Sequence, residues 1–287
     1  MMKNILITGA TGFLGSELLG LLKSREYNLY CPIRKGSKPE IHSENIIYYK
    51  TDLTNSEVFI KDTKRHVNKC DFIIHLASNI SCSFPKECFQ ANLQFTETVI
   101  KSADTFDDAK LFFISSSSAS LSKLSSYGKS KYLSEKRIQN ECKEWVILRF
   151  PILFGGGDKN VNEIIRLCKS KKIVPIFGNG KYRVQPLYVT DAAKAITLIL
   201  QEYRDYSNEI IDLMGLKTYR FIDLVRLIAA NIPHKVYLIK IPALVWFPPM
   251  KILGLLSSKI IQLAERIMDL VQDKYFSNDV TKKLLRD

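Results

Sequence analysis

The sequence predicts an α/β fold in which helices cover both faces of a parallel sheet. Short apolar runs typical of buried strands, such as residues 5–7, 72–74 and 111–114, alternate with longer amphipathic segments. The first run leads into three closely spaced glycines, and a helical segment starts directly after them. A strand, a glycine turn and a helix in this order begin a βαβ unit, so we expect a doubly wound sheet.

The glycine turn is the segment Thr8-Gly-Ala-Thr-Gly-Phe-Leu-Gly15. Gly9 lets the chain turn sharply off the strand, Gly12 lets the backbone approach a pyrophosphate, and Gly15 lets the helix lie close to the sheet. Phosphates would then face free N–H groups and the positive end of the helix dipole. The strand before the turn and the helix after it favour a dinucleotide-binding, Rossmann-type sheet over an ordinary strand–turn–helix.

Length and charge set the broad class of the protein. The 287 residues suffice for one large domain or for a nucleotide-binding core with a smaller lobe. The net charge of +13 suggests anionic partners such as a phosphorylated small molecule or an acidic membrane surface. The sequence contains no block of basic residues interleaved with aromatic ones, so no nucleic-acid partner is expected.

The six cysteines show no Cys-x-x-Cys pair and no histidine at metal-ligand spacing, so no metal site is expected. They are typical of reduced cysteines in a cytoplasmic protein. The N-terminus leads directly into the first strand, which leaves no room for a signal peptide.

The second strand, residues 28–33, ends in Arg34. An NAD site places an acidic residue here to accept the ribose 2′-OH, whereas a basic residue suits the 2′-phosphate of NADP. No Asp or Glu occurs between Tyr27 and Pro39. We therefore expect NADP(H) to be preferred and NAD(H) to be possible; in the alternative interpretation Arg34 is simply solvated.

The third strand, residues 46–49, leads to Asp52 and Leu53, and the fourth, residues 72–78, ends in small side chains that suit close approach of a cofactor. His75 lies inside this apolar run. Because it has no obvious acidic partner, we expect a structural histidine bonded to backbone rather than a catalytic one.

The chemical centre follows the fifth strand, residues 111–114, where four serines precede the helical segment that starts at Tyr127-Gly-Lys-Ser-Lys131. Tyr127 and Lys131 are four residues apart and share one helical face. A phenol has a pKa of about 10, but a nearby ammonium and a positive nicotinamide both favour the phenolate. A serine at the strand end can hydrogen-bond the reacting oxygen. The alternative is a surface Tyr and Lys on an ordinary helix.

Together these motifs resemble the extended short-chain dehydrogenase/reductases of the nucleotide-sugar epimerase/dehydratase type. Segments 149–155 (Arg-Phe-Pro-Ile-Leu-Phe-Gly) and 187–191 (Leu-Tyr-Val-Thr-Asp) add to a likeness that covers the whole chain, most closely up to about residue 200. The resemblance implies that the three glycines hold the pyrophosphate, that Arg34 holds a 2′-phosphate, and that Asp52 and Leu53 flank the adenine.

The resemblance also implies the remaining site residues. Tyr127 would be the acid/base, and Lys131 would orient the ribose and lower the pKa of the tyrosine. The serine run allows more than one register, and among Ser116, Ser117 and Ser118 we expect Ser117 to be catalytic. Further residues expected to bind the cofactor are Thr11, Phe13, Leu14, Leu76, Ala77, Ser78, Pro151 and Ile152, and those expected to bind substrate are Asn79 and Arg183.

Three features differ from sugar-nucleotide epimerases. Only nine residues separate Ser117 from Tyr127, Pro151-Ile152 replaces a polar asparagine, and Arg183 lies one position from the usual diphosphate-clamping arginine. Tyr30-Cys31 followed by Arg34 is similar to acyl reductases of the same superfamily. Keto-group reduction or epimerisation on a nucleotide-activated sugar is the activity implied; the alternatives are an NADPH-dependent reductase of an acyl or small carbonyl substrate and a non-catalytic NADP-sensing module.

In the C-terminal third we expect a strand at 184–189, a helix at 192–200 capped by Asp191, a strand at 209–213 and a helix at 221–231. Residues 1–150 with 186–205 would form the NADP-binding domain, and 151–185 with 206–287 a smaller α/β substrate lobe. Prolines and Lys251 interrupt the apolar segment 241–258, so it is expected in the lobe core rather than across a membrane. The sequence leaves open a peripheral membrane contact and a homodimer.

Overall fold

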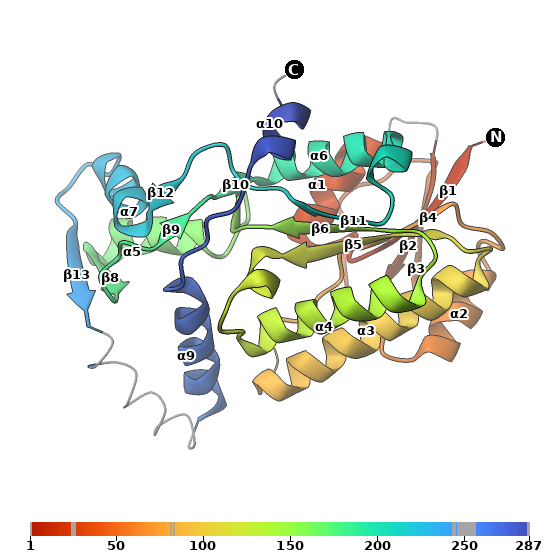
Figure 1. The fold of residues 1–287 in the computed structure, drawn as a ribbon, viewed down its shortest axis with the longest axis horizontal. Helices are drawn as coiled ribbons and strands as arrows, with labels where there is room; N and C mark the ends of the chain where they lie inside the picture. Colours follow the sequence, from red (N-terminus) through yellow and green to blue (C-terminus); the bar gives the residue numbers. More distant parts are fainter. Residues whose placement is uncertain are drawn as a thin grey trace.

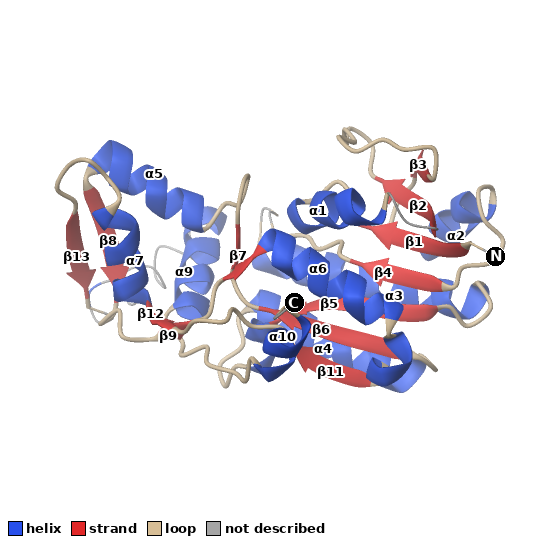
Figure 2. Ribbon diagram, turned by 90° about the horizontal axis from the view of Figure 1, so that it is seen from above, coloured by secondary structure: helices blue, strands red, loops and turns tan. Residues whose placement is uncertain are grey.

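The computed structural model describes residues 2–23, 27–80, 82, 84–242, 245 and 257–285. Its centre is a parallel sheet in the order β11-β6-β5-β4-β1-β2-β3 (Figures 1 and 2). The direction of winding changes between β1 and β4, so the carboxyl ends of these two strands flank the crevice in which such sheets bind ligands. The strands are β1 (Lys3–Thr8), β2 (Tyr27–Ile33), β3 (Ile46–Lys50), β4 (Phe72–His75), β5 (Lys110–Ser116), β6 (Trp145–Phe150) and β11 (Glu209–Asp212).

Helices cover both faces of this sheet, which confirms the predicted doubly wound fold (Figure 1). On one face lie α1 (Phe13–Leu22) and α6 (Val189–Gln201); on the other lie α2 (Ser56–Lys64), α3 (Pro85–Thr105) and α4 (Ser126–Glu141). Alternate strand residues point to opposite faces, so Ile5 and Ile7 join the α1/α6 core and Leu6 joins the other. Burial on both faces explains why the strands are continuously apolar.

A smaller α/β lobe lies beyond the carboxyl ends of the core strands (Figure 2). It contains α5 (Val161–Lys171), the parallel strands β8 (Ile173–Phe177) and β13 (Tyr237–Ile241), and α7 (Phe221–Ala230). Cys168, Val174 and Ile176 are fully buried at its centre. Two short strand pairs connect lobe and core: β7 (Leu153–Phe154) with β10 (Leu187–Tyr188), and β9 (Arg183–Val184) with β12 (Tyr219–Arg220).

Three expectations for the C-terminal third are wrong. The strand expected at 184–189 is split into β9 and β10 around Gln185 and Pro186, and proline cannot donate to a strand ladder. Helix α6 starts at Val189, so Asp191 lies inside its first turn and does not cap it. The strand β11 belongs to the main sheet beside β6 and not to the lobe. The helix α10 (Asp279–Leu284) also returns to the core, against α6 and β11.

The helix α9 (Ser258–Leu270) lies across the N-terminal end of α4 (Figure 1). Most of the apolar segment expected in the lobe core, residues 243, 244 and 246–256, lies outside the described residues. Among the helices that the structure describes, none combines the length and the apolar character needed to cross a bilayer.

One pair of cysteines departs from the expected reduced state. Cys82 and Cys88 form a disulfide, with their Cα atoms 5.5 Å apart, a separation typical of such bonds. Cys88 lies in the first turn of α3, six residues after Cys82, a spacing that matches no metal-ligand motif. Cys31, Cys70, Cys142 and Cys168 are free thiols.

Candidate functional site

The glycine turn forms a close passage between β1, α1 and the end of β4. Gly9 adopts a φ of +76°, and a Cβ atom there would lie 2.6 Å from the backbone nitrogen of Ala77. The Gly12 N–H donates to the Gly9 carbonyl at 3.0 Å, which closes the turn. A Cβ on Gly15 would collide with the carbonyl groups of Gly9 and Ala10. Glycine at these positions keeps the N-terminus of α1 open to an anionic group.

The end of β4 is fixed by a buried pair of side chains. The Thr8 hydroxyl lies 2.6 Å from His75 Nδ1, and both residues are 1% exposed. Burial, with a smaller effect of the Lys131 charge, lowers the pKa of His75 to about 3. His75 is therefore a neutral, structural residue as expected, although its partner is a hydroxyl rather than backbone.

The four serines at the end of β5 and in the turn after it, residues 115–118, lie in different surroundings. Ser115 donates to Glu135 on α4, Ser118 donates to Asp269 on α9, and Ser117 is 2% exposed. Ser116 lines the cavity beside Tyr127, and its hydroxyl oxygen accepts from the Ser118 N–H at 3.2 Å. The serine that lines the cavity is therefore Ser116, one residue before the expected Ser117, while the identity of the catalytic serine stays a prediction.

Tyr127 and Lys131 face the same cavity from the first turns of α4, which Ser125 caps by accepting from the Gly128 N–H. The Lys131 ammonium donates to the Ile114 carbonyl at 2.7 Å and lies 6.0 Å from the centroid of the Tyr127 ring. Burial lowers the pKa of Lys131 to about 8, while Glu135 acts in the opposite direction.

The environment of Tyr127 favours the protonated phenol. Burial, followed by the negative charge of Asp269, raises the pKa of Tyr127 to about 12, and the hydrogen bond with Ser116 offsets this only in part. The expectation that Lys131 lowers this pKa is not met in the structure. Tyr127 is therefore a proton donor at neutral pH in the protein alone.

These groups surround one cavity of about 260 Å³ at the carboxyl edge of the sheet. Most of the expected cofactor residues line it, together with residues that sequence reasoning missed. The expected ones are Gly9, Gly12, Phe13, Leu14, Gly15, Leu76, Ser78, Tyr127, Lys131 and Pro151; the missed ones are Ile114, Ser115, Phe150 and Leu153. Ser116, one of the three candidate serines, also lines the cavity. The missed residues lie at or just after the carboxyl ends of β5 and β6. These strand ends lie beside predicted site residues, so they could have been included in the predicted site.

Several expected residues lie outside this lining set, namely Thr11, Arg34, Asp52, Leu53, Ala77 and Ile152. Arg34 and Asp52 are exposed just after the carboxyl ends of β2 and β3. Asp52 accepts from the backbone N–H and the hydroxyl of Thr54 at 2.9 and 2.7 Å. Ala77 borders Gly9 through its backbone, as noted above.

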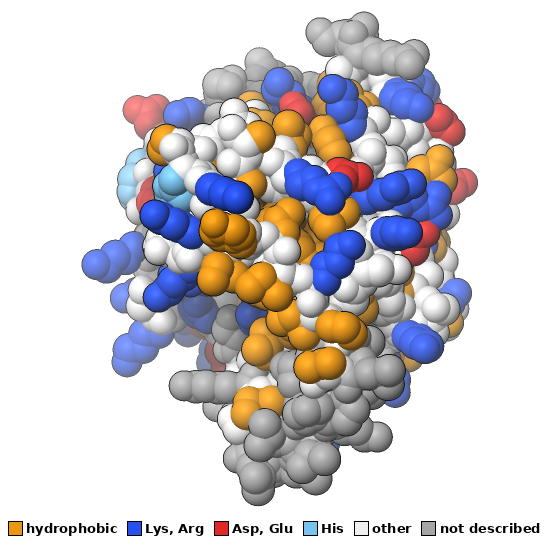
Figure 3. All heavy atoms as spheres, turned by 90° about the vertical axis from the view of Figure 1, so that its left-hand side faces the viewer, with side chains coloured by type: hydrophobic (Ala, Val, Ile, Leu, Met, Phe, Trp, Pro, Cys, Tyr) orange, Lys and Arg blue, Asp and Glu red, His pale blue; other side chains and the backbone are white. Residues whose placement is uncertain are grey.

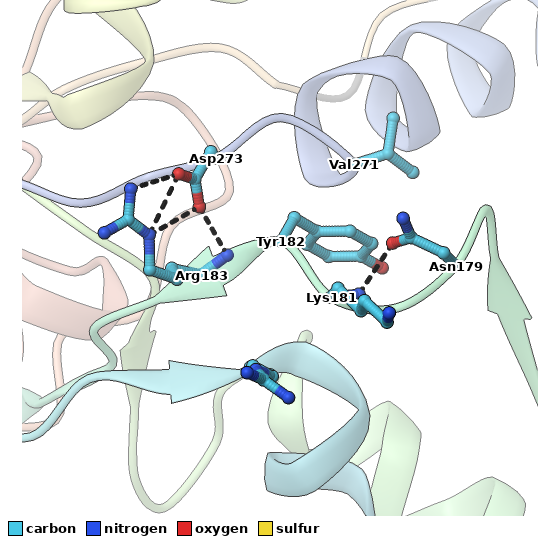
Figure 4. A pocket seen from close by; sticks show the side chains of 7 residues that line it. Asn179, Lys181, Tyr182, Arg183, Val271 and Asp273 are labelled. Carbon is cyan, nitrogen blue, oxygen red and sulfur yellow. Dashed lines mark hydrogen bonds and ion pairs between the residues drawn. The ribbon is translucent and has the colours of Figure 1, made fainter.

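The two expected substrate residues are engaged elsewhere. Arg183 forms a bidentate pair with Asp273 and stacks on Tyr275, 4.3 Å from the ring centroid. It lines a separate hollow of about 480 Å³ between the β8–β9 turn and the end of α9 (Figure 4). The backbone N–H of Asn79 donates to the Asn92 side chain at 2.7 Å. Neither residue lines the cavity that holds Tyr127.

The lining of the cavity suits the pyrophosphate and the reacting end of a dinucleotide. A glycine cradle, the start of α1 and the small side chains after β4 leave room for a pyrophosphate. The same cavity extends to Tyr127, Lys131 and Ser116, which supply a proton donor, a cation and a hydroxyl for the reacting end of such a cofactor.

Comparisons with known proteins agree with this geometry. The "Putative UDP-glucose 4-epimerase" of Methanocaldococcus jannaschii is 27% identical over 242 residues, covering 73% of this chain and 76% of its own. The nucleoside-diphosphate-sugar epimerase of Staphylococcus aureus superposes with a TM-score of 0.78 at 13% identity, covering 99% and 96% of the two chains. The terminal R domain from the myxalamid PKS-NRPS biosynthetic pathway gives 0.75 at 18% identity, covering 99% and 85%.

The family assignment rests on a match over most of the chain. Residues 5–213 match the NAD dependent epimerase/dehydratase family, from β1 to the end of β11. This range includes every residue around the cavity that holds Tyr127. The chain therefore belongs to the NAD dependent epimerase/dehydratase family, the enzymes of the extended short-chain dehydrogenase/reductase type.

Proposed function

We propose that this protein is an NADP(H)-preferring oxidoreductase or epimerase that acts on a keto group of a nucleotide-activated sugar. One observation carries the proposal: a single cavity joins the glycine turn to Tyr127, Lys131 and Ser116. The sugar class is supported by the names of the relatives, two of which are nucleotide-sugar epimerases.

In this proposal each residue has a distinct role. When bound, the dinucleotide gives or takes the hydride. Gly9, Gly12 and the first turn of α1 hold its pyrophosphate, and Lys131 orients its ribose. Tyr127 donates its phenolic proton to the oxygen of the carbonyl being reduced, or removes the proton when a hydroxyl is oxidised. The Ser116 hydroxyl hydrogen-bonds the same oxygen.

A second candidate is reduction of an acyl or small carbonyl substrate. It is favoured by Arg183, whose guanidinium is neutralised by Asp273 and so is not presented to a substrate diphosphate. The two candidates share the Tyr127 chemistry and differ in the part of the substrate away from the carbonyl. A screen of keto-sugar nucleotides against small aldehydes and thioesters with NADPH distinguishes them.

The test of the shared chemistry is Tyr127→Phe. Removal of the hydroxyl takes away the proton donor, so turnover should fall by roughly 10²- to 10⁴-fold. NADPH affinity, measured by fluorescence titration, should stay within about threefold because the ring still fills its place. Turnover at the wild-type rate would exclude Tyr127 from the mechanism. Tyr132→Phe, on the exposed side of the same helix, is the matched control.

We also propose that the outer face of the lobe contacts an anionic membrane surface. On β8 and β13 the paired residues Ile173 and Tyr237 face away from the lobe core, and so does Ile239. They are 44%, 53% and 48% exposed. Hydrophobic side chains gather on this side of the molecule with Lys and Arg around them (Figure 3).

The charge around this face supports a negatively charged partner. Both strands lie in segments 164–190 and 224–264, which contain eleven Lys and Arg but no Asp or Glu. Three of the eleven, Arg166, Arg183 and Arg226, pair with acids outside these segments. The Lys235 ammonium lies 5.1 Å from the Tyr237 ring centroid. An apolar face with a cationic border is the arrangement by which proteins bind acidic lipid surfaces.

A further inference from the structure

Helix α9 contacts the catalytic region through one row of polar side chains. Glu265 and Asp269 lie four residues apart, so they share one helical face; Gln262, one turn earlier, donates instead to the Cys82 carbonyl. Glu265 accepts from the backbone N–H and the hydroxyl of Ser126, at 3.3 and 2.7 Å. Gln272, just after the helix, exchanges hydrogen bonds with the backbone of Lys123. Glu265 and Gln272 therefore bind the segment that leads from β5 into α4.

Asp269 is at the centre of these contacts. Its carboxylate accepts from the Ser118 hydroxyl at 2.9 Å and from the Ser125 hydroxyl at 3.2 Å. Lys274 forms an ion pair with the same carboxylate at 2.5 Å and also contacts the Ser118 hydroxyl at 3.3 Å. The side chains of Lys274 and Asp269 are 9% and 18% exposed, so water screens this pair little.

The two serines that Asp269 binds flank Tyr127 in space. Ser118 follows Ser116, which lines the same cavity as the tyrosine, by two residues, and Ser125 caps the helical turn that carries Tyr127. The backbone around them is close-packed, since a Cβ on Gly128 would lie 2.7 Å from the Ser118 carbonyl oxygen. A group that binds both serines therefore sets the distance between the serine turn and the start of α4.

We propose that Asp269, held by Lys274, is a positioning residue for Tyr127: it joins the serine turn to the start of α4 and places a carboxylate beside the phenol. The inference rests on the proposed role of Tyr127. The groups that act on the phenol are then Ser116 from β5, Lys131 from α4 and Asp269 from α9, with Lys274 opposing Asp269. A carboxylate in this place favours the protonated phenol. The phenol can then donate its proton to the oxygen of the carbonyl that is being reduced.

The test is the titration of Tyr127 itself, which needs no substrate. Phenolate absorbance near 295 nm is followed from about pH 9 to about pH 13 in the full-length protein, a range that includes the Tyr127 pKa of about 12. The same protein with Tyr127→Phe is subtracted, which leaves one phenol. Asp269→Asn keeps an acceptor oxygen for both serines but removes the charge. It should move the titration of Tyr127 to lower pH by about one unit. Lys274→Gln removes the positive charge that opposes the Asp269 carboxylate, so it should move the titration of Tyr127 to higher pH.

Glu265→Gln is the matched control, because Glu265 lies on the same helical face and binds the same turn but is not among the groups that shift the Tyr127 pKa. Its titration should match that of the wild type. An unchanged titration in both Asp269→Asn and Lys274→Gln, or an equal shift in Glu265→Gln, overturns the inference. Loss of turnover in Tyr127→Phe is a separate measurement, so failure of the proposed function is recognised independently.

Discussion

Arg34 is the single side chain on which cofactor choice is expected to depend. It is exposed just after β2, next to the strand that carries the glycine turn, and no ion pair within the described part of the chain engages it. A guanidinium in this position gains charge-assisted hydrogen bonds from a 2′-phosphate but little from a 2′-hydroxyl. The family uses NAD, so the preference for NADP(H) is a proposal about this one residue.

Arg34→Glu should weaken NADPH binding by roughly 10- to 100-fold, the loss of a hydrogen bond to a charged group together with new charge repulsion. NADH binding should change little, because a carboxylate can accept from the ribose 2′-OH. Fluorescence titration with both nucleotides measures this, and Lys35→Glu, the next exposed cation, is the control. Equal weakening of both nucleotides would contradict the assignment of Arg34.

At the scale of elements, the start of α4 is closely fitted against the serine turn. Gly128 lies against the Ser118 carbonyl, whereas a Cβ on Gly20, inside α1, would meet nothing within 4 Å. Gly128→Ala must push α4 away from the serine turn, so turnover should fall at least about tenfold, as for other displacements of a catalytic group by a fraction of an ångström.

Gly20→Ala is the counterpart on a helix with free space. It should stabilise the protein by about 0.5–1 kcal/mol, because alanine costs less backbone entropy in a helix, and leave turnover unchanged. Thermal unfolding and activity of the two variants give the comparison. Equal activity in Gly128→Ala and the wild type would show that the spacing between α4 and the serine turn does not matter.

Local sequence was enough to predict the elements that build the cavity. The glycine turn, the apolar strands and the Tyr127/Lys131 helix each follow from residues within about one turn of one another. The serine register did not, because four identical side chains differ only in what they face, and one of those partners, Asp269, is more than 140 residues away in the chain. The pairing of Arg183 with Asp273 could not be predicted for the same reason, because the two residues are 90 positions apart in the chain.

At the scale of the whole molecule, the two acid-free segments 164–190 and 224–264, which include β8 and β13 of the lobe, carry +11 of the formal net charge of +13. Full-length protein should sediment with vesicles of phosphatidylcholine and phosphatidylglycerol at 0.15 M salt, and much less at 0.5 M, where charges are screened within a few ångströms. Ile239→Asp should reduce this binding several-fold. Leu216→Asp, which alters a side chain of similar exposure outside the lobe sheet, should not.

Two outcomes would overturn the membrane proposal. Equal binding to pure phosphatidylcholine vesicles would remove the charge argument. A protein dimer that Ile239→Asp dissociates would assign the same face to a second copy of the chain.

The return of the C-terminal third to the main sheet has a consequence for biosynthesis. Strand β11 and helix α10 complete a core whose first strand starts at Lys3, and the whole lobe segment 151–185 is made in between. During synthesis, most strands of the nucleotide-binding sheet therefore emerge from the ribosome well before the edge strand β11. The edge of β6 has no partner strand during that interval. The main sheet therefore contains both the first strand to be synthesised and one of the last.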